Sequence, residues 1–231
     1  MIGYDARLDF LGWAMVLTNS SLNKEIVVSN IPFAISEKNV LRELRIPLLK
    51  TLQELPEKHL AEYIKKAIDT AYTLIEGKGI YRTFAVEKII EDRAIVQGSD
   101  SLFIGKNMVK LLKNCPYVTV MASTIGLGLE DKVETLKAGS PSDAYYLEVV
   151  GGWMADYMAE QLDKRIEPEI RKSGYGRTMR YSPGYGDWDL TCQGEMMRMT
   201  QASRIGISLT ESFIMIPRKS VTAAIGWERT Q

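Results

Sequence analysis

Apolar residues recur at three- and four-residue steps in two long segments, a spacing that places them on one face of an α-helix. The first segment covers residues 56–76, and its apolar positions are Leu60, Ile64, Ala67, Ile68, Ala71 and Ile75. The second covers residues 141–166, and its apolar positions are Leu147, Val150, Met154, Met158, Leu162 and Ile166. We therefore predict an amphipathic helix over each segment.

Segments rich in β-branched and aromatic residues predict strands. The clearest is 117–122, whose continuous apolar character is typical of a strand buried on both faces. Further strands are expected at residues 24–28, 80–96, 207–210, 213–216 and 221–227, and shorter helices at 36–41, 101–113 and 189–205. No internal repeat or Pro/Gly/Ser-rich linker divides the chain. The pattern predicts a single α+β domain over residues 1–231, with a small N-terminal extension over residues 1–30.

A glycine-containing turn, Ser123 to Gly128, follows the strand at 117–122. Gly126 and Gly128 have part of the spacing of a phosphate-binding loop, but the third glycine and the Gly-Lys-Ser/Thr sequence are missing. A loop that lines a pocket is therefore a better interpretation than a nucleotide phosphate site.

Small residues form a second line on the long helix at 141–166, at Gly151, Ala155 and Ala159. Glycine destabilises a helix, so either a packed neighbour or a ligand must come very close to the backbone here. Asp156 and Glu160 lie one helical turn apart and so project from the same side. They are either a carboxylate pair of a site or two solvated charges.

The composition excludes several classes of function. Lys and Arg total 29, as do Asp and Glu, and this balance argues against a nucleic-acid surface. The chain has two cysteines, Cys115 and Cys192, and one histidine, His59. A Cys/His zinc site and a Ser-His-Asp triad are therefore poor hypotheses, and we expect no metal ligands. Both cysteines are interpreted as buried apolar residues.

The only early apolar run, residues 10–17, is short and follows Asp5, Arg7 and Asp9. It is typical neither of a secretory signal nor of a membrane span. We therefore expect a cytoplasmic protein with no membrane partner.

The segment Arg180-Tyr181-Ser182-Pro183-Gly184-Tyr185-Gly186-Asp187-Trp188 carries the clearest functional signal. The guanidinium of Arg180 can bind a carboxylate or a phosphate through two parallel hydrogen bonds. The glycines allow the backbone to approach a ligand, and Pro183 stiffens the turn. This combination indicates a loop that binds a small molecule.

The C-terminal half resembles the activation domain of cobalamin-dependent methionine synthase, the module that binds S-adenosylmethionine. The family's Arg-x-x-x-Gly-Tyr motif is matched by Arg180, Gly184 and Tyr185. Other matching segments are Gly186–Trp188 with Gln193, residues 205–210, residues 217–221, Val40–Leu44 and Ala122–Gly126. The resemblance covers residues 31–228. It implies a mainly antiparallel, twisted sheet flanked by helices.

The resemblance also implies how the site residues act. Arg180 would bind the methionyl carboxylate, while backbone groups around Ser182 and Gly184 would meet the nucleoside or the amino-acid part of the ligand. Tyr185 would order the loop or contact the ligand near its sulfonium. Because a sulfonium favours carboxylates and aromatic faces, Asp156, Tyr181 and Trp188 become further candidates. The family usually carries Glu at the position aligned with Asp156.

In the family, S-adenosylmethionine remethylates a cobalt cofactor that has been oxidised to Co(II), while a flavodoxin-type donor supplies an electron. Cobalt is the nucleophile, so no catalytic acid or base is expected from this chain. The chain contains no segment that resembles the corrinoid-binding modules or their Asp-x-His-x-x-Gly motif. The resemblance therefore implies an accessory protein in a methyltransferase system, which reactivates cobalamin held by a separate methionine synthase or another corrinoid methyltransferase.

Two alternatives use the same residues differently. One is a non-catalytic module that senses S-adenosylmethionine or docks onto a corrinoid protein. The other is an unrelated small-molecule methyltransferase, which the absence of a Gly-x-Gly-x-Gly loop after a first strand disfavours.

Overall fold

The computed structural model describes residues 22–229, so the apolar run at residues 10–17 lies outside the described residues. In chain order the elements are β1 (Ile26–Val28), α1 (Glu37–Glu43), α2 (Lys58–Leu74), β2 (Lys78–Ile90), β3 (Arg93–Val96), β4 (Ser99–Ile104), α3 (Lys106–Leu112), β5 (Tyr117–Thr124), α4 (Gly128–Lys137), α5 (Pro141–Lys172), β6 (Tyr175–Arg177), α6 (Gln193–Thr200), β7 (Ser208–Leu209), β8 (Met215–Ile216) and β9 (Ser220–Arg229). Short 3₁₀ turns lie at Leu52–Glu54, Leu190–Cys192 and Ala202–Ile205.

The main sheet has seven strands in the order β4-β3-β2-β5-β9-β6, with β1 also paired to β2. Neighbouring strands run antiparallel throughout this sheet. β7 and β8 form a separate two-stranded hairpin. Residues 22–30 of the predicted extension include β1, which extends the sheet along the edge of β2.

Helices cover both faces of this sheet. On one face α5 runs along the strands, and Tyr81, Met121 and Ile225 pack into the core beneath it. On the other face α3 and α6 cover Val118, Val120 and other apolar residues. In β5 and β9 the residues alternate between the two cores, so these strands are buried on both sides, as the apolar run at 117–122 predicted.

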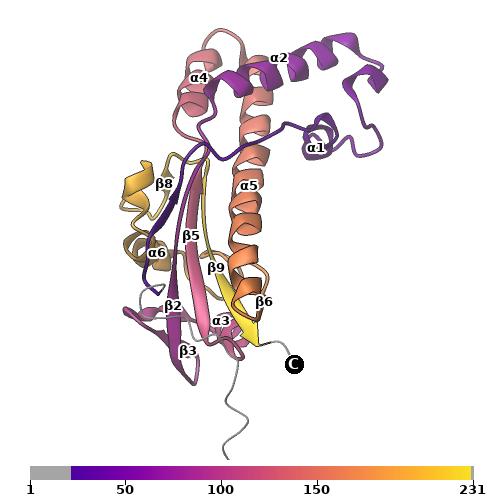
Figure 1. Ribbon diagram of the computed structural model, residues 1–231. Coiled ribbons are helices and arrows are strands. Elements are labelled where there is room, and N and C mark those ends of the chain that lie inside the picture. The colour runs from indigo at the N-terminus through magenta and orange to yellow at the C-terminus, as the bar shows by residue number, and fades with distance from the viewer. Residues whose placement is uncertain (1–21, 230–231) are drawn as a thin grey trace, which may run out of the picture.

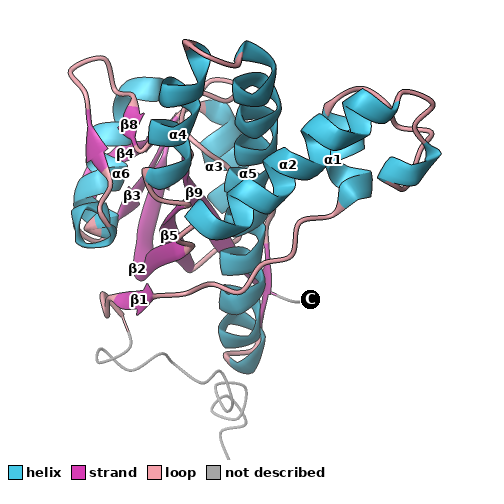
Figure 2. Cartoon of the chain, turned by 90° about the horizontal axis from the view of Figure 1, so that it is seen from above, coloured by secondary structure: helices cyan, strands magenta, loops and turns pink. Residues whose placement is uncertain are grey.

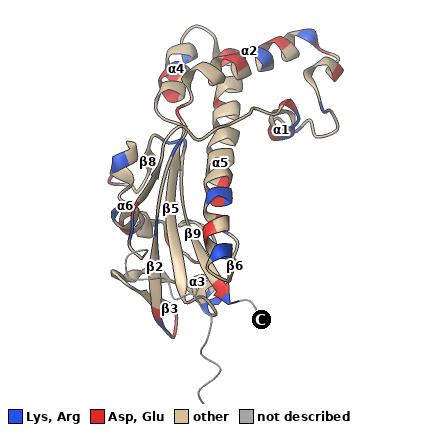
Figure 3. Ribbon diagram, in the orientation of Figure 1, with Lys and Arg blue, Asp and Glu red and all other residues tan. Residues whose placement is uncertain are grey.

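The helices α1 and α2 extend away from the sheet at the end where α4 lies, as two views at right angles show (Figures 1 and 2). Ser36 caps α1 and accepts a hydrogen bond from the backbone N–H of Asn39. Figure 3 shows charged residues along α2, α4 and α5, whereas the central strands carry few. This distribution follows from burial, because an unpaired charge inside the core would cost several kcal/mol.

Two predicted helices differ in the structure. Residues 101–104 of the helix expected at 101–113 belong to strand β4, and only Lys106–Leu112 is helical. The stripe of apolar residues fitted a helix, but pairing of β4 with β3 fixes the strand. The helix expected at 189–205 is divided, because Gln201 adopts a left-handed conformation with φ of 57° between α6 and a 3₁₀ turn.

The structure decides between a ligand and a packed neighbour at Gly151. A Cβ added to Gly151 would lie 2.5 Å from Cδ2 of Leu129, so α4 packs directly against this part of α5. The adjacent Gly152 is open, and its nearest neighbour would be Nζ of Lys219 at 3.8 Å. Gly151 is therefore explained by contact between two helices.

Substituting these two glycines tests that packing. We expect Gly151→Val to lower the free energy of unfolding by about 1–3 kcal/mol, because the buried Leu129 must move. We expect the matched control Gly152→Val to stay within about 0.5 kcal/mol of the wild type. Urea denaturation measures both values, and equal losses would contradict the packing explanation.

Candidate functional site

A groove of about 580 Å³ lies between the Arg180–Trp188 loop, the β7–β8 hairpin and the first residues of β9. Arg180, Tyr181, Ser182 and Tyr185 line it from the loop, and Asp156 lines it from α5. The fold thus brings five of the seven predicted site residues to one surface. Its volume is in the ordinary range for small-molecule sites.

Backbone pairing with the sheet sets the position of the loop. Tyr181 N–H donates to the carbonyl of Ala224 at 2.9 Å, and Ala224 N–H donates to the carbonyl of Tyr181 at 2.8 Å. Within the loop, the Gly184 N–H donates to the Trp188 carbonyl at 2.7 Å, and Gly184 has φ of 89°. This left-handed conformation favours glycine, so Gly184 shapes the turn.

The remaining predicted site residues, Gly184 and Trp188, do not line the groove. Trp188 is 1% exposed, and its indole N–H donates to the carbonyl of Leu102 at 2.8 Å. Its ring stacks on Tyr181, with centroids 5.9 Å apart and an angle of 6° between the planes. Trp188 therefore lies behind the ring of Tyr181 and supports it.

Arg180 is the cation of the groove that lacks an ion pair within residues 22–229. Its Nη1 is buried with no hydrogen-bond partner there. The other groove arginine, Arg218, lies 3.7 Å from Glu130 and 3.9 Å from Glu134. The groove can therefore take an anionic group at Arg180.

Asp156 and Glu160, one helical turn apart on α5, have different surroundings. Asp156 is exposed at the groove and forms no ion pair with any residue of the described part of the chain. Glu160 instead pairs with Lys164, at 2.6 Å between Oε1 and Nζ. Only Asp156 therefore contributes a negative charge to the groove.

Sequence reasoning missed the opposite wall of the groove. It consists of Phe213, Ile214 and Met215 from the hairpin and Ser220, Val221 and Thr222 from β9. Gln193 is 2% exposed at the start of α6, and its amide donates to Oγ1 of Thr222 at 2.8 Å. The family resemblance included Gln193, Ser220 and Val221 but gave them no site role. No local signal marks the other residues of this wall, because the pairing of distant segments brings them to the loop.

The turn at Ser123–Gly128 does not contribute to this groove. Ser123 and Thr124 belong to β5, and the turn leads into α4, where a Cβ on Gly128 would lie 3.1 Å from the carbonyl oxygen of Leu74. The turn therefore packs against the end of α2.

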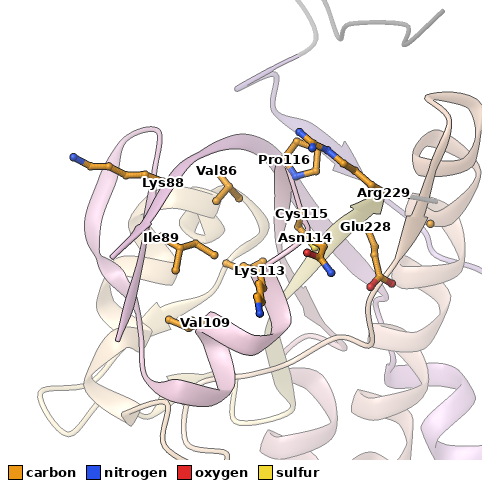
Figure 4. Close-up of a pocket in the computed structure, with 12 residues that line it drawn as sticks. Val86, Lys88, Ile89, Val109, Lys113, Asn114, Cys115, Pro116, Glu228 and Arg229 are labelled. Carbon is orange, nitrogen blue, oxygen red and sulfur yellow. The ribbon is translucent and has the colours of Figure 1, made fainter. Parts of the chain in front are cut away.

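A second hollow, of about 1090 Å³, lies near the opposite end of β9 (Figure 4). Ile89, Val109 and Lys113 line one side, and Glu228 lies on the other. Cys115 is 5% exposed there, and burial raises the pKa of its thiol to about 12. The thiol therefore stays protonated at neutral pH, in agreement with its interpretation as a buried apolar residue.

Within residues 22–229, no cluster of His, Cys, Asp and Glu could hold a metal ion. None of the helices in that range is both long and apolar enough to cross a bilayer.

The structure thus combines an antiparallel sheet that has helices on both faces with a groove in which Arg180 forms no ion pair within residues 22–229. The sequence profile described as "Vitamin B12 dependent methionine synthase, activation domain" matches residues 99–230. The match covers more than half of the chain, and the chain therefore belongs to this family. The comparison with curated proteins gave no match.

Among solved structures, the crystal structure of the MetH reactivation domain bound to AdoHcy is similar, with a TM-score of 0.65 and 15% sequence identity. The similarity covers 90% of this chain and 79% of that chain. At this identity it shows the fold, and it confirms the predicted α+β class with a mainly antiparallel sheet.

The loop geometry can be tested at Gly186. Its φ is 56°, and an added Cβ would lie 2.3 Å from the hydroxyl of Tyr181 and 2.5 Å from Nδ2 of Asn107. We expect Gly186→Ala to lower the free energy of unfolding by about 2–4 kcal/mol, through backbone strain and the clash together.

The matched control is Gly206→Ala, because Gly206 has φ of 84° and nothing within 4 Å of an added Cβ. This variant introduces the backbone strain without a clash, and we expect its free energy of unfolding to fall by about 1–2 kcal/mol. Chemical denaturation of both variants measures the difference. If Gly186→Ala loses no more unfolding free energy than Gly206→Ala, the loop accommodates a side chain at Gly186.

Proposed function

We propose that the groove binds S-adenosylmethionine with its methionyl carboxylate at Arg180. The observation that carries the proposal is the unpaired guanidinium of Arg180, which lies in a groove of suitable volume in a chain of this family. The similar MetH reactivation domain was crystallised with AdoHcy, a ligand that bears the same carboxylate. A charge-assisted, two-pronged contact suits this pair of groups.

The other residues of the loop complete this site. Tyr181 and Asp156 offer an aromatic face and a carboxylate to the sulfonium, and both line the groove. Backbone groups around Ser182 and Gly184 contact the nucleoside or the amino-acid part of the ligand, and Tyr185 orders the loop or contacts the ligand near its sulfonium. Gly184 shapes the turn, and Trp188 acts through Tyr181, on which it stacks.

S-adenosylmethionine supplies a sulfonium methyl group to a nucleophile when it is bound. We propose that this nucleophile is the reduced cobalt of cobalamin, held as a substrate by a partner methionine synthase or another corrinoid methyltransferase. A flavodoxin-type protein would donate the electron, in the cytoplasm. This chain then orients the methyl donor and needs no acid or base of its own.

Exposed apolar residues at the mouth of the groove favour this arrangement. Met179 is 72% exposed, Tyr185 is 68% exposed and Ile214 is 52% exposed. Together they give an apolar rim against which a large partner can exclude water from the groove. The alternative, a module that senses S-adenosylmethionine or docks onto a corrinoid protein without methyl transfer, would use the same rim.

Thermal-shift and calorimetric titrations with S-adenosylmethionine test the binding site. Wild-type protein should gain stability on titration, because the ligand binds the folded state. We expect Arg180→Ala to weaken binding by about 1.5–3 kcal/mol, the contribution of a hydrogen-bonded charge.

The matched control is Arg218→Ala, which removes a second cation from the same groove. Because Glu130 and Glu134 already compensate that charge, the control should weaken binding by less than about 1 kcal/mol. Equal binding by wild type and Arg180→Ala would overturn the assignment of Arg180.

A methyl-transfer assay separates the proposed function from the sensing alternative. The protein, S-adenosylmethionine, cob(II)alamin and a low-potential reductant are mixed, and methylcobalamin is measured by its absorption spectrum. We expect methylcobalamin to form faster than in the mixture without protein, and Arg180→Ala to abolish the increase. Tight binding of S-adenosylmethionine with no increase in methylcobalamin, even with a corrinoid-protein partner present, would favour the sensing module.

A further inference from the structure

Two buried polar atoms of opposite charge lie without partners beside the groove. One is Nη1 of Arg180, and the other is Oδ1 of Asp163. Both residues line a third hollow, of about 660 Å³, that adjoins the groove along Met179 and Arg180. Buried polar groups in native proteins nearly always have hydrogen-bond partners, so an unpartnered donor and an unpartnered acceptor in one place require an explanation.

Asp163 is held in place by the fold. It lies on α5 and is 6% exposed, and its Oδ2 accepts a hydrogen bond from Nη1 of Arg177 at 2.9 Å. Arg177 in turn lies 3.5 Å from Glu167, one turn further along α5. This pairing fixes the carboxylate of Asp163 and leaves Oδ1 for another donor.

Charge couples Asp163 to Arg180. Burial raises the pKa of the Asp163 carboxyl, while Arg177 and Arg180 oppose that rise and Glu167 adds to it. The two side chains also line the same hollow, beside Met179 and Thr178. Arg177 already has two acidic partners, Asp163 and Glu167, whereas Arg180 has no ion pair within residues 22–229. Oδ1 of Asp163 is therefore the buried, unpartnered acceptor in this hollow to which Arg180 can donate a hydrogen bond.

We propose that Asp163 is a positioning residue for Arg180. Its Oδ1 accepts a hydrogen bond from Nη1 of Arg180, directly or through one bound water, when Arg180 binds the carboxylate of the ligand. The inner edge of the guanidinium then faces Asp163, and its outer edge faces the groove. The inference rests on the proposed function, because it assigns the outer edge to a ligand carboxylate.

This arrangement has a physical advantage. A guanidinium held on one side loses less conformational freedom when it forms two hydrogen bonds on the other side. The negative charge of Asp163 also compensates the buried cation before the ligand arrives. Asp163 should therefore strengthen binding of ligands that carry a carboxylate, and it should matter little to the same ligand without one.

The experiment uses the full chain and two ligands: S-adenosylmethionine and its decarboxylated analogue, in which hydrogen replaces the carboxylate. We expect Asp163→Asn to weaken the binding of S-adenosylmethionine by about 10-fold, the usual effect of losing a charged hydrogen-bond partner. Binding of the analogue should change by less than 2-fold. Because Arg180→Ala removes the group through which Asp163 acts, the double variant should bind S-adenosylmethionine as weakly as Arg180→Ala alone.

Glu167→Gln is the matched control, since it removes another carboxylate that pairs with Arg177 from the same face of α5. It should leave both affinities within about 2-fold of the wild type. If Asp163→Asn weakens the binding of both ligands equally, its role is merely structural and the inference is overturned. Unchanged binding of S-adenosylmethionine would overturn it as well.

The proposed function fails in a different way. If wild-type protein does not bind S-adenosylmethionine, or if Arg180→Ala binds it equally well, the site assignment itself is wrong. If both of those expectations hold and only Asp163→Asn behaves like the wild type, the positioning role alone is wrong.

A measurement on the wild-type protein covers the case in which Asp163→Asn does not fold. The Nη groups of Arg180, assigned by their loss in Arg180→Lys, are followed by ¹⁵N NMR with S-adenosylmethionine bound. We expect slow rotation about both Cζ–Nη bonds, because both edges of the guanidinium are then held. Rapid rotation of the Nη1 group in the complex would overturn the proposal.

Discussion

The backbone pairing of Tyr181 with Ala224 determines where the candidate site can exist. It attaches the Arg180–Trp188 loop to the free edge of β9, beside the segment that β6 pairs. The opposite wall of the groove leads directly into the same strand, through residues 217–219. Since β9 also pairs with β5 in the centre of the sheet, the register of the sheet sets the distance between the two walls.

The distribution of charge around α5 and the loop is the second constraint. Four arginines line the groove and the adjoining hollow, and they differ in their partners. Arg171 pairs with Glu167 at 2.6 Å. Arg177 pairs with Asp163 and Glu167, and Arg218 lies near Glu130 and Glu134. Arg180 has one buried nitrogen without a partner. A buried donor without a hydrogen-bond partner costs stability, so its retention at a groove is typical of a binding site.

The sequence was informative where the signal is local. The apolar stripe of α5 and the buried run of β5 specify those elements. The residues that form most of one wall of the groove are neighbours in the sequence, within the Arg180–Tyr185 segment. The rest depends on long-range pairing. Residues 101–104 fit a helical stripe but form a strand because β3 lies beside them. Likewise, Phe213 and Thr222 reach the groove only after the sheet has formed.

The attachment of both walls to β9 has a consequence for how a ligand is admitted. The loop and residues 220–222 of the opposite wall cannot separate without breaking strand pairing, so this part of the groove is preorganised and little backbone entropy is lost on binding. The side chains at its mouth, among them Met179 and Ile214, are exposed and free to change rotamer. Entry and release are then governed by fast side-chain motion, and the backbone acts as a fixed template.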